Sequence, residues 1–474
     1  MFKAISFFIT LIFCTPLITF GQHSLEGNWK GYIDLMGNHL KINTHFKKHG
    51  NKLTGTIDIP QQGARGLNLQ QIARPEKDSV SFGFPAGPGY ATFSGTINSD
   101  STISGIFTQH RQQFPFKLTR SPQAESETVS KKRPALPYHH KDLIIQNGPV
   151  KIGGTLTRPE NKPADQLVIL ISGSGAQDRD ESLDPITSFK PFAMLADSLT
   201  FHGIATFRYD DRGIGESTGN FYQATLDTLA SDLESIIHHF SKASADHNFK
   251  HIVLLGHSQG GILAGRVAAK NSNVDRVILM SSPGISLKKV LRYQVRQSFE
   301  ASDIPDNQIK KEISAREQLM DALRKDKNIS EAKAKYLHAF EAIQRKTLQA
   351  ANKDTSNVSS MGKEQTQALV SGYGSPQMQS LLFYDPAKDL KKLRIPVLVL
   401  MGGKDIQVPI DKNEKPIKDA LESAGTSYKI ETFPEANHLY QNAKTGKVSE
   451  YTKLPSKFVD GFITTIIQWL QSPQ

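Results

Sequence analysis

From residue 141 onward, short runs of strand-forming residues alternate with stretches of helical periodicity. Gln166–Ile171 and Val277–Met280 are apolar at almost every position, as expected of strands that are buried on both faces. An amphipathic helical pattern runs from about Thr225 to Phe240. This alternation predicts an α/β domain with a mostly parallel, doubly wound sheet. Further strands are expected at Leu143–Gln146, Val150–Thr157, Ile204–Tyr209, Ile252–Leu255, Pro396–Met401 and Tyr428–Phe433. Further helices are expected at Phe192–Phe201, in the segment that ends at Ala269, and at about Pro455–Leu470.

The alternation is interrupted between about residues 285 and 385. This insert is rich in Lys, Glu, Gln and Ala, and its pattern is predominantly helical. It is too long for a plain connection between two strands. We therefore expect a helical cap over the open end of the sheet.

Residues 27–120 carry a different pattern, in which half-buried strands are separated by turns. Leu40–Phe46 alternates apolar and polar positions, and Leu53–Ile59 resumes strand composition after a polar turn. We expect a small antiparallel all-β domain over residues 22–120, either sandwich-like or a partial barrel. A polar, proline-containing linker over residues 121–140 then leads to the α/β domain at residues 141–474.

The all-β domain has no recognisable catalytic constellation, because its histidines are scattered at strand-like spacings. A structural or substrate-presenting role is therefore the favoured interpretation. A further hypothesis is that this domain contacts a polysaccharide or a lipid surface.

The first 21 residues have the pattern of a secretory signal peptide. Lys3 precedes an almost uncharged apolar run, and the sequence becomes polar after Gly21. The alternative is an uncleaved membrane anchor, although Pro16 interrupts the run. No later segment reaches the ~18 consecutive apolar residues of a membrane span. We therefore expect an exported protein, periplasmic or extracellular, with no stable membrane span after signal removal.

The cysteine content excludes several kinds of chemistry. Cys14 is the only cysteine and lies within the expected signal peptide. A processed chain would therefore have no thiol, which excludes disulfides, zinc–thiolate sites and a cysteine nucleophile.

The formal net charge of +11 raises the question of nucleic-acid binding. The basic residues are spread along the chain and interleaved with acidic ones, and no helix-turn-helix, zinc-finger or RNP pattern is present. A solvated basic surface is the favoured interpretation, and we expect no nucleic-acid partner.

The segment Gly256-His-Ser-Gln-Gly260 fits the pattern G-x-S-x-G. The pattern alone is weak, but here an apolar run precedes it and a helical pattern rich in small residues follows. That context is typical of a strained strand-to-helix turn that exposes a serine hydroxyl. Ser258 is therefore the candidate nucleophile, and the alternative is a small polar residue in a tight turn.

A serine nucleophile needs a histidine to accept its proton and an acid to orient that histidine. On this architecture the expected chain order is serine, acid, histidine. Asp405 follows the strand expected to end at Met401, and His438 follows the strand expected to end at Phe433. These two residues are the candidate acid and base. The competing residues are Asp411 and Glu435 for the acid and His338, within the insert, for the base.

The tetrahedral intermediate of such a reaction needs hydrogen-bond donors for its oxyanion, each worth ~3 kcal/mol in barrier height. One candidate is the backbone N–H of Gln259, which directly follows the nucleophile. The other is the backbone N–H of Ser174, within the sequence Ser172-Gly-Ser-Gly175 that follows the strand ending at Ile171. The alternative for this second segment is a flexible Gly/Ser loop.

Three stretches resemble the α/β-hydrolase superfamily, and most closely its bacterial secreted esterase and serine-aminopeptidase-like branch. They are ISGSGAQDRDE (171–181), FRYDDRGIGEST (207–218) and GHSQGG (256–261), supported by MGGKDIQVP and PEANH downstream. The resemblance spans residues 141–474 apart from the insert, and it implies the α/β-hydrolase fold and a Ser-His-Asp triad. Many members have histidine where this chain has Ser172, which puts the anchoring of that loop in question. The clusters at 178–180 and 210–212 resemble a polar network that holds the loop, with direct substrate binding as the alternative.

These observations predict a secreted serine hydrolase that cleaves small-molecule carboxylic esters through an acyl-enzyme. No metal and no organic cofactor is implied. One alternative is a serine aminopeptidase or amidase with the same triad. The other is a non-catalytic binding module on a hydrolase scaffold.

Overall fold

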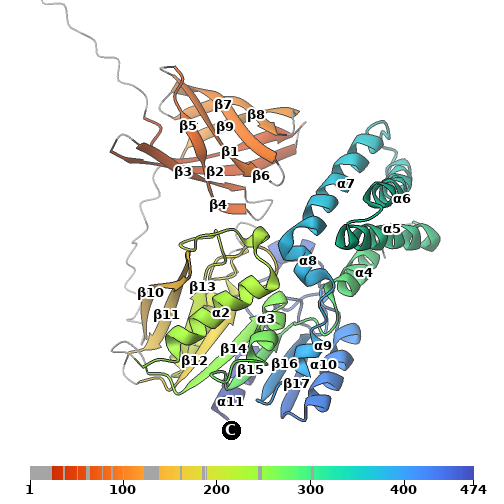
Figure 1. Ribbon diagram of the computed structural model, residues 1–474. Helices are drawn as coiled ribbons and strands as arrows, with labels where there is room; N and C mark the ends of the chain where they lie inside the picture. Colours follow the sequence, from red (N-terminus) through yellow and green to blue (C-terminus); the bar gives the residue numbers. More distant parts are fainter. Residues whose placement is uncertain are drawn as a thin grey trace, which may run out of the picture. The chain divides into compact units, whose positions relative to one another are not determined.

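The structure is a computed structural model, and it describes residues 24–35, 38–50, 52–59, 64–76, 78–86, 89–99, 101–109, 112–121, 138–160, 163–183, 187, 189–243, 248–299 and 304–473. The expected signal peptide and most of the expected linker lie outside these residues. Contacts divide the chain into two compact units, the first made mainly of residues up to 127 and the second mainly of residues from 128 onward. Figure 1 shows the elements of both units.

In the first unit, the described residues form one antiparallel sheet of nine strands in the order β4-β3-β2-β1-β9-β8-β7-β6-β5. The end strands β4 and β5 are consecutive in the chain, separated only by Leu69, whose N–H donates to the carbonyl of Gly55 in β3 at 2.8 Å. The sheet therefore rolls into a barrel, not a sandwich (Figure 1). The strands are β1 (Gly27–Leu35), β2 (Asn38–His49), β3 (Lys52–Ile59), β4 (Ala64–Asn68), β5 (Gln70–Ala73), β6 (Ser79–Ala86), β7 (Gly89–Ser99), β8 (Thr102–Gln109) and β9 (Gln112–Arg120).

Aromatic side chains fill the inside of this barrel. Phe82 stacks on Phe93 with ring centroids 4.7 Å apart, and Phe116 meets Phe93 edge-on at 5.0 Å. Trp29 is fully buried and its indole N–H donates to the carbonyl of Leu25 at 2.9 Å. Burial of these rings, with polar residues alternating outward, accounts for the period-two pattern of the sequence.

In the second unit, eight strands among the described residues form a sheet in the order β10-β11-β13-β12-β14-β15-β16-β17. β11 is antiparallel to both of its neighbours, and the pairs from β13 to β17 are parallel. This is the strand order of the α/β-hydrolase fold, so the expected fold class is confirmed. The strands are β10 (Tyr138–Asn147), β11 (Val150–Pro159), β12 (Gln166–Ile171), β13 (Ala205–Tyr209), β14 (His251–His257), β15 (Arg276–Met280), β16 (Val397–Gly402) and β17 (Tyr428–Phe433).

Both faces of this sheet are covered by helices. Along β12, Leu167, Ile169 and Ile171 belong to one hydrophobic core, whereas Val168 and Leu170 belong to the other. The first core includes side chains of α2, α3 and α10, and the second includes side chains of α1 and α11. The helices are α1 (Pro191–Phe201), α2 (Leu226–Phe240), α3 (Gln259–Ala268), α10 (Ile410–Ala424) and α11 (Phe462–Gln471).

The insert between β15 and β16 is helical, as expected, and its helices gather beyond the main sheet (Figure 1). Three small apolar clusters hold it together, one of them centred on Tyr336. Its helices are α4 (Leu287–Ser298), α5 (Asp306–Lys325), α6 (Ile329–Ala350), α7 (Val358–Gly374) and α8 (Pro376–Leu382), and the short α9 (Ala387–Leu390) leads into β16.

The expectation of a last helix from about Pro455 was wrong, because α11 begins only at Phe462. Gly461 precedes it with φ 82°, a left-handed conformation that ends any continuous helix at this point. The N–H of Val459 donates to the carbonyl of Tyr440 at 2.7 Å, which fixes this segment against the loop after β17. The apolar side chains of this segment are therefore buried, although the segment is a loop and not part of a helix. A smaller difference is that β10 begins at Tyr138, earlier than the strand expected at Leu143.

Within the described part of the chain, no helix combines the length and apolar character needed to cross a membrane.

Candidate active site

The register of the parallel strands brings four loops to one edge of the sheet. Ile171 at the end of β12 pairs with Gly256, His257 pairs with Met280, and Gly402 pairs with Phe433. The strands β12, β14, β16 and β17 therefore end at the same edge. The loops that follow them carry all five residues predicted from the sequence: Ser174, Ser258, Gln259, Asp405 and His438.

Ser258 lies at the bend between β14 and α3. Its φ of 52° and ψ of −118° are strained for a residue with a side chain. The N–H of Ser258 donates to the carbonyl of Met280 at 2.8 Å, and its own carbonyl accepts from Gly261 at 3.0 Å. These bonds hold the strain in place, and this is the conformation expected of a nucleophile elbow.

The two outer glycines of the motif are required by sterics. A Cβ on Gly256 would lie 2.2 Å from the carbonyl oxygen of Gly260. A Cβ on Gly260 would lie 2.1 Å from the carbonyl oxygen of Ile171 and 2.5 Å from that of Ser172. Only glycine fits at either position, because the turn packs its backbone directly against the loop after β12.

Asp405 and His438 form a buried pair. The Nδ1 atom of His438 lies 2.8 Å from Oδ2 of Asp405, and the residues are 6% and 5% exposed. The other carboxylate oxygen of Asp405 accepts the backbone N–H groups of Gln407 and Val408 at 2.8 and 2.9 Å. The acid is thus fixed on both oxygens and presents one of them to the imidazole.

The competing residues lie elsewhere. Asp411 pairs with Lys412 at 2.7 Å, and Glu435 pairs with Lys404. His338 is exposed on α6. None of the three contacts the Asp405–His438 pair through a hydrogen bond among the described residues.

The structure does not join Ser258 to His438 by a hydrogen bond within the described residues. The two are linked through His257, the neighbour of Ser258, whose ring centroid lies 4.6 Å from that of His438. Serine–histidine hydrogen bonds are often long before substrate binds, so this spacing is compatible with a triad.

The loop after β12 lies against the nucleophile. A Cβ on Gly173 would be 3.4 Å from the Cβ of Ser258 and 3.3 Å from Oε1 of Glu181. In the described part of the chain, the N–H groups of Ser174 and Gln259 make no hydrogen bond. Two donors without partners beside Ser258 are what an oxyanion hole requires.

Sequence reasoning missed two residues at this site, Glu181 and His257. Nδ1 of His257 lies 2.7 Å from Oε1 of Glu181, and Nε2 of His257 lies 3.0 Å from the carbonyl oxygen of His438. The same Oε1 accepts the N–H of Gly173 at 2.9 Å. Burial lowers the pKa of His257, but the charge and hydrogen bond of Glu181 raise it, and the net direction is upward. The only signal in the sequence was the position of His257 within the motif.

Ser172 anchors the loop after β12 through a side-chain hydrogen bond. Its hydroxyl donates to Oδ2 of Asp211 at 3.1 Å, and the N–H of Gln177 donates to that oxygen at 2.9 Å. Burial without a cationic partner raises the pKa of Asp211 to about 8. The serine that replaces the histidine of many similar proteins therefore still holds the loop, through its hydroxyl group.

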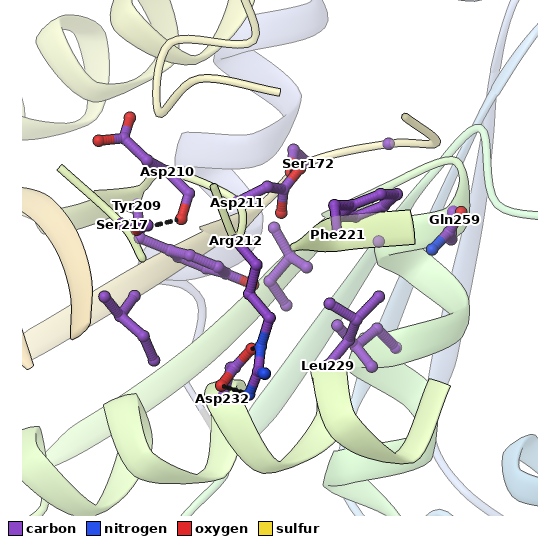
Figure 2. Close-up of a pocket in the computed structure, with 15 residues that line it drawn as sticks. Ser172, Tyr209, Asp210, Asp211, Arg212, Ser217, Phe221, Leu229, Asp232 and Gln259 are labelled. Carbon is purple, nitrogen blue, oxygen red and sulfur yellow. Dashed lines mark hydrogen bonds and ion pairs between the residues drawn. The ribbon is translucent and has the colours of Figure 1, made fainter. Parts of the chain in front are cut away.

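A pocket lies behind this loop (Figure 2). Its volume is about 430 Å³ including its open mouth. Ser172, Asp211 and Gln259 line one side, and the Arg212–Asp232 ion pair closes the other, with Nε to Oδ2 at 2.6 Å. Phe221 and Leu229 supply apolar wall. The pocket is thus polar where it meets the loop after β12.

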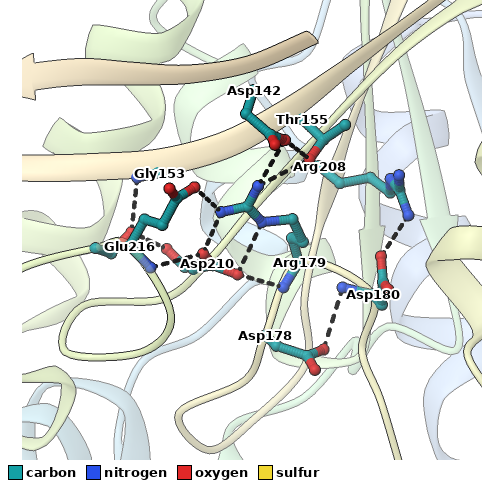
Figure 3. Close-up of polar contacts among 10 residues, drawn as sticks. Asp142, Gly153, Thr155, Asp178, Arg179, Asp180, Arg208, Asp210 and Glu216 are labelled. Atoms are coloured by element: carbon teal, nitrogen blue, oxygen red, sulfur yellow. Dashed lines mark hydrogen bonds and ion pairs between the residues drawn. The ribbon is translucent and has the colours of Figure 1, made fainter. Parts of the chain in front are cut away.

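Arg179 is the centre of a second polar network (Figure 3). Its guanidinium donates to Asp210 at 2.6 Å, to Glu216 at 2.7 Å and to Asp142 at 3.1 Å. Asp210 also accepts the backbone N–H of Arg179 at 2.9 Å. These contacts tie the loop after β12 to the loop after β13, so the acidic clusters of the sequence act as scaffold.

The insert touches the site at two points. The side-chain amide of Gln377 in α8 donates to Oε1 of Gln259 at 3.2 Å, and both residues are buried. The side-chain amide of Gln294 in α4 donates to the carbonyl of Gln407 at 2.8 Å, next to Asp405. The insert is therefore bonded to the turn at Ser258 and to the loop that carries Asp405, as a cap over the site would be.

Among the described residues, no group of three or more histidine, cysteine, aspartate or glutamate side chains is arranged to hold a metal ion.

Two family models match parts of the chain. The family described as "Serine aminopeptidase, S33" matches residues 187–358, which include Ser258. The family described as "Dienelactone hydrolase family" matches residues 306–457, which include Asp405 and His438.

One characterised relative matches nearly the whole chain. It is Esterase EstD of Thermotoga maritima, 22% identical over 453 residues that cover 95% of this chain and 93% of the relative. Among solved structures, the Pyrococcus furiosus esterase PF2001 is similar, with 14% identity, a TM-score of 0.43, and coverage of 71% of this chain and 92% of that one. The esterase EaEST of Exiguobacterium antarcticum has 18% identity, a TM-score of 0.39, and coverage of 70% and 100%.

Proposed function

We propose that this chain is a serine hydrolase of the α/β-hydrolase superfamily that cleaves carboxylic esters through an acyl-enzyme. The observation that carries the proposal is the buried Asp405–His438 pair, with a 2.8 Å hydrogen bond, at the same sheet edge as the strained turn of Ser258. A second support is the match to a hydrolase named as an esterase over 95% of the chain.

In this mechanism the Oγ atom of Ser258 attacks the ester carbonyl carbon, and Nε2 of His438 takes the hydroxyl proton. The N–H groups of Ser174 and Gln259 donate to the oxyanion of the tetrahedral intermediate. His438 then gives its proton to the departing alcohol as the carbon–oxygen bond breaks. Water attacks the acyl-enzyme with His438 as base, which releases the acid and restores Ser258. Asp405 keeps His438 in the tautomer that leaves Nε2 facing the serine.

The surrounding carboxylates favour an ester over a peptide with a free amino terminus. An aminopeptidase needs a carboxylate to hold the substrate ammonium. Among the carboxylates bonded to the catalytic loops in the described structure, the three nearest in the hydrogen-bond network already have protein partners: Glu181 has His257, Asp405 has His438, and Asp211 has Ser172 and Gln177. The amidase alternative therefore has support only from the partial family match.

We also propose that the protein is exported and that the barrel contacts a polysaccharide or lipid surface. Export rests on the apolar segment of residues 1–21, which lies outside the described residues. Immunoblots of fractionated cells test it, because a cleaved chain would be found outside the cytoplasm.

The test of the enzymatic proposal uses p-nitrophenyl esters of increasing acyl length and aminoacyl p-nitroanilides. We expect ester turnover by the wild-type protein and its loss in Ser258→Ala. Turnover of anilides alone would instead favour the peptidase. Absence of turnover with retained ligand binding would favour a non-catalytic module.

A further inference from the structure

We propose that His257, paired with Glu181, is a positioning residue that ties the oxyanion loop to the loop of the general base. The inference rests on the proposed function and deepens it. It concerns the residue directly before the nucleophile, outside the Ser258–His438–Asp405 triad.

The bridge consists of three hydrogen bonds. Oε1 of Glu181 accepts the N–H of Gly173, at the start of the oxyanion loop, at 2.9 Å. The same oxygen lies 2.7 Å from Nδ1 of His257. Nε2 of His257 lies 3.0 Å from the carbonyl oxygen of His438. A continuous path therefore runs from the oxyanion loop, through the neighbour of the nucleophile, to the general base.

The partners of His257 determine its protons. A carbonyl oxygen only accepts, so Nε2 of His257 must carry a hydrogen. Oε1 of Glu181 already accepts from Gly173, and Oε2 of Glu181 has no hydrogen-bond partner among the described residues. A carboxyl proton on Oε1 would donate to Nδ1 and leave the pair neutral, whereas an ionised Glu181 requires a hydrogen on Nδ1 as well. The charge and hydrogen bond of Glu181 favour the second arrangement, in which His257 is doubly protonated and positively charged.

The burial of this pair makes it hard to replace. Glu181 is 1% exposed and His257 is 3% exposed. Glu181 also has a φ of 53°, a strained value that its surroundings must maintain. Removing either partner would leave the other group buried without compensation. The loops that the bridge connects would then lose their common anchor.

The charge also acts on the general base. The His257 and His438 rings lie 4.6 Å apart, and the carboxylates of Glu181 and Asp405 are the other charged groups that influence His257. A doubly protonated His257 would place a positive charge beside the imidazole ring of His438.

The kinetic test compares His257→Gln and Glu181→Gln with the wild-type protein and with His251→Gln. His251 is a matched control, because it lies at the other end of β14 and its Nδ1 is 3.4 Å from a carboxylate oxygen of Asp275. We expect kcat on p-nitrophenyl acetate to fall about 10²-fold in His257→Gln with little change in KM, as for a misplaced reacting group. The double variant should lose no more than the worse single variant.

Proton NMR of the full chain gives a readout that does not need activity. We expect a low-field imidazole N–H signal that disappears in His257→Gln, remains in His438→Gln, and persists well above the ordinary histidine pKa of about 6.5. It should be lost at neutral pH in Glu181→Gln.

Two outcomes would overturn the proposal. One is a wild-type kcat in His257→Gln while Ser258→Ala is inactive, which leaves the proposed function intact. The other is a His257 ring that titrates at the ordinary value. Wild-type ester turnover in Ser258→Ala would instead refute the proposed function, and the NMR result would still decide the charge of His257.

Discussion

Two buried histidine–carboxylate pairs meet at the edge of the main sheet, and they are built from different regions. His438 and Asp405 come from the loops after β17 and β16, whereas His257 and Glu181 come from the end of β14 and the loop after β12. In both pairs Nδ1 faces a carboxylate oxygen, at 2.8 and 2.7 Å respectively.

The pairs differ at the second ring nitrogen. Nε2 of His257 is bonded to a backbone carbonyl, whereas Nε2 of His438 makes no hydrogen bond within the described residues. An imidazole ring with both nitrogens hydrogen-bonded to the protein can carry a charge or fix a loop in place, but it cannot exchange a proton with a substrate. Residue type and burial therefore do not identify a general base, and the free nitrogen does.

The largest expected effect separates the two histidines by activity. His438→Gln should lower kcat on p-nitrophenyl acetate about 10⁶-fold, because it removes the proposed acceptor of the serine proton. His257→Gln should lose only about 10²-fold. Steady-state kinetics of the two variants check this ratio, and equal losses would mean that both histidines serve the same step.

The next effect separates the competing acids. Asp405→Asn should lower kcat about 10⁴-fold, since an amide no longer holds His438 in the productive tautomer. Asp411→Asn is the matched control, because Asp411 lies in the first turn of α10 and its carboxylate pairs with Lys412. It should keep wild-type activity. A larger loss in Asp411→Asn than in Asp405→Asn would reverse the assignment.

A third buried carboxylate, Asp211, lacks the histidine that both pairs have. Its pKa is raised from 3.8 to about 8, so the folded protein favours the neutral form. The stability contributed by this group is fully present below about pH 4 and is lost as pH rises to about 8, by at most about 1.4 kcal/mol per pH unit.

Asp211→Asn stays neutral at every pH. The free energy of unfolding of Asp211→Asn, relative to that of the wild-type protein, should therefore increase as pH rises from about 4 to 8. Urea denaturation at a series of pH values measures this difference. Parallel pH profiles for the two proteins would contradict the raised pKa.

The smallest expected effect concerns Ser172. Ser172→Ala removes the hydroxyl that donates to Asp211 and should lower the free energy of unfolding by about 1 kcal/mol. We expect only a minor decrease in kcat, because the proposed oxyanion donors are backbone groups. Thermal unfolding and ester kinetics measure both, and a loss of activity as large as that of Asp405→Asn would show that Ser172 takes part in the reaction itself.

The elements that position the triad could be predicted from local sequence. The strands at Gln166–Ile171 and Tyr428–Phe433 have the bounds that their composition indicated. Period and composition are local properties, and parallel strands that end together bring their loops to one edge. The predicted start of the last helix was wrong because it depends on tertiary contacts. The apolar residues before Phe462 belong to a loop that a hydrogen bond to Tyr440 holds in place.

The second pair could not be predicted in this way. Glu181 and His257 are 76 positions apart, and nothing in either neighbourhood indicates the other. In the sequence, Glu181 is one acidic residue in a charged run, and His257 occupies a variable position of the G-x-S-x-G pattern. Their pairing depends on the backbone path of the loop after β12, including the left-handed conformation at Glu181. Such a path is fixed only by tertiary packing.

The most direct test of the triad is mass spectrometry of the acyl-enzyme. The wild-type protein is mixed with an excess of p-nitrophenyl acetate, quenched in acid and digested. We predict one acetyl group on the peptide that contains Ser258, more of it in Asp405→Asn if deacylation slows further than acylation, and none in Ser258→Ala. Ester turnover by the wild-type protein with the acetyl group on another residue, or with undiminished turnover in Ser258→Ala, would contradict the account.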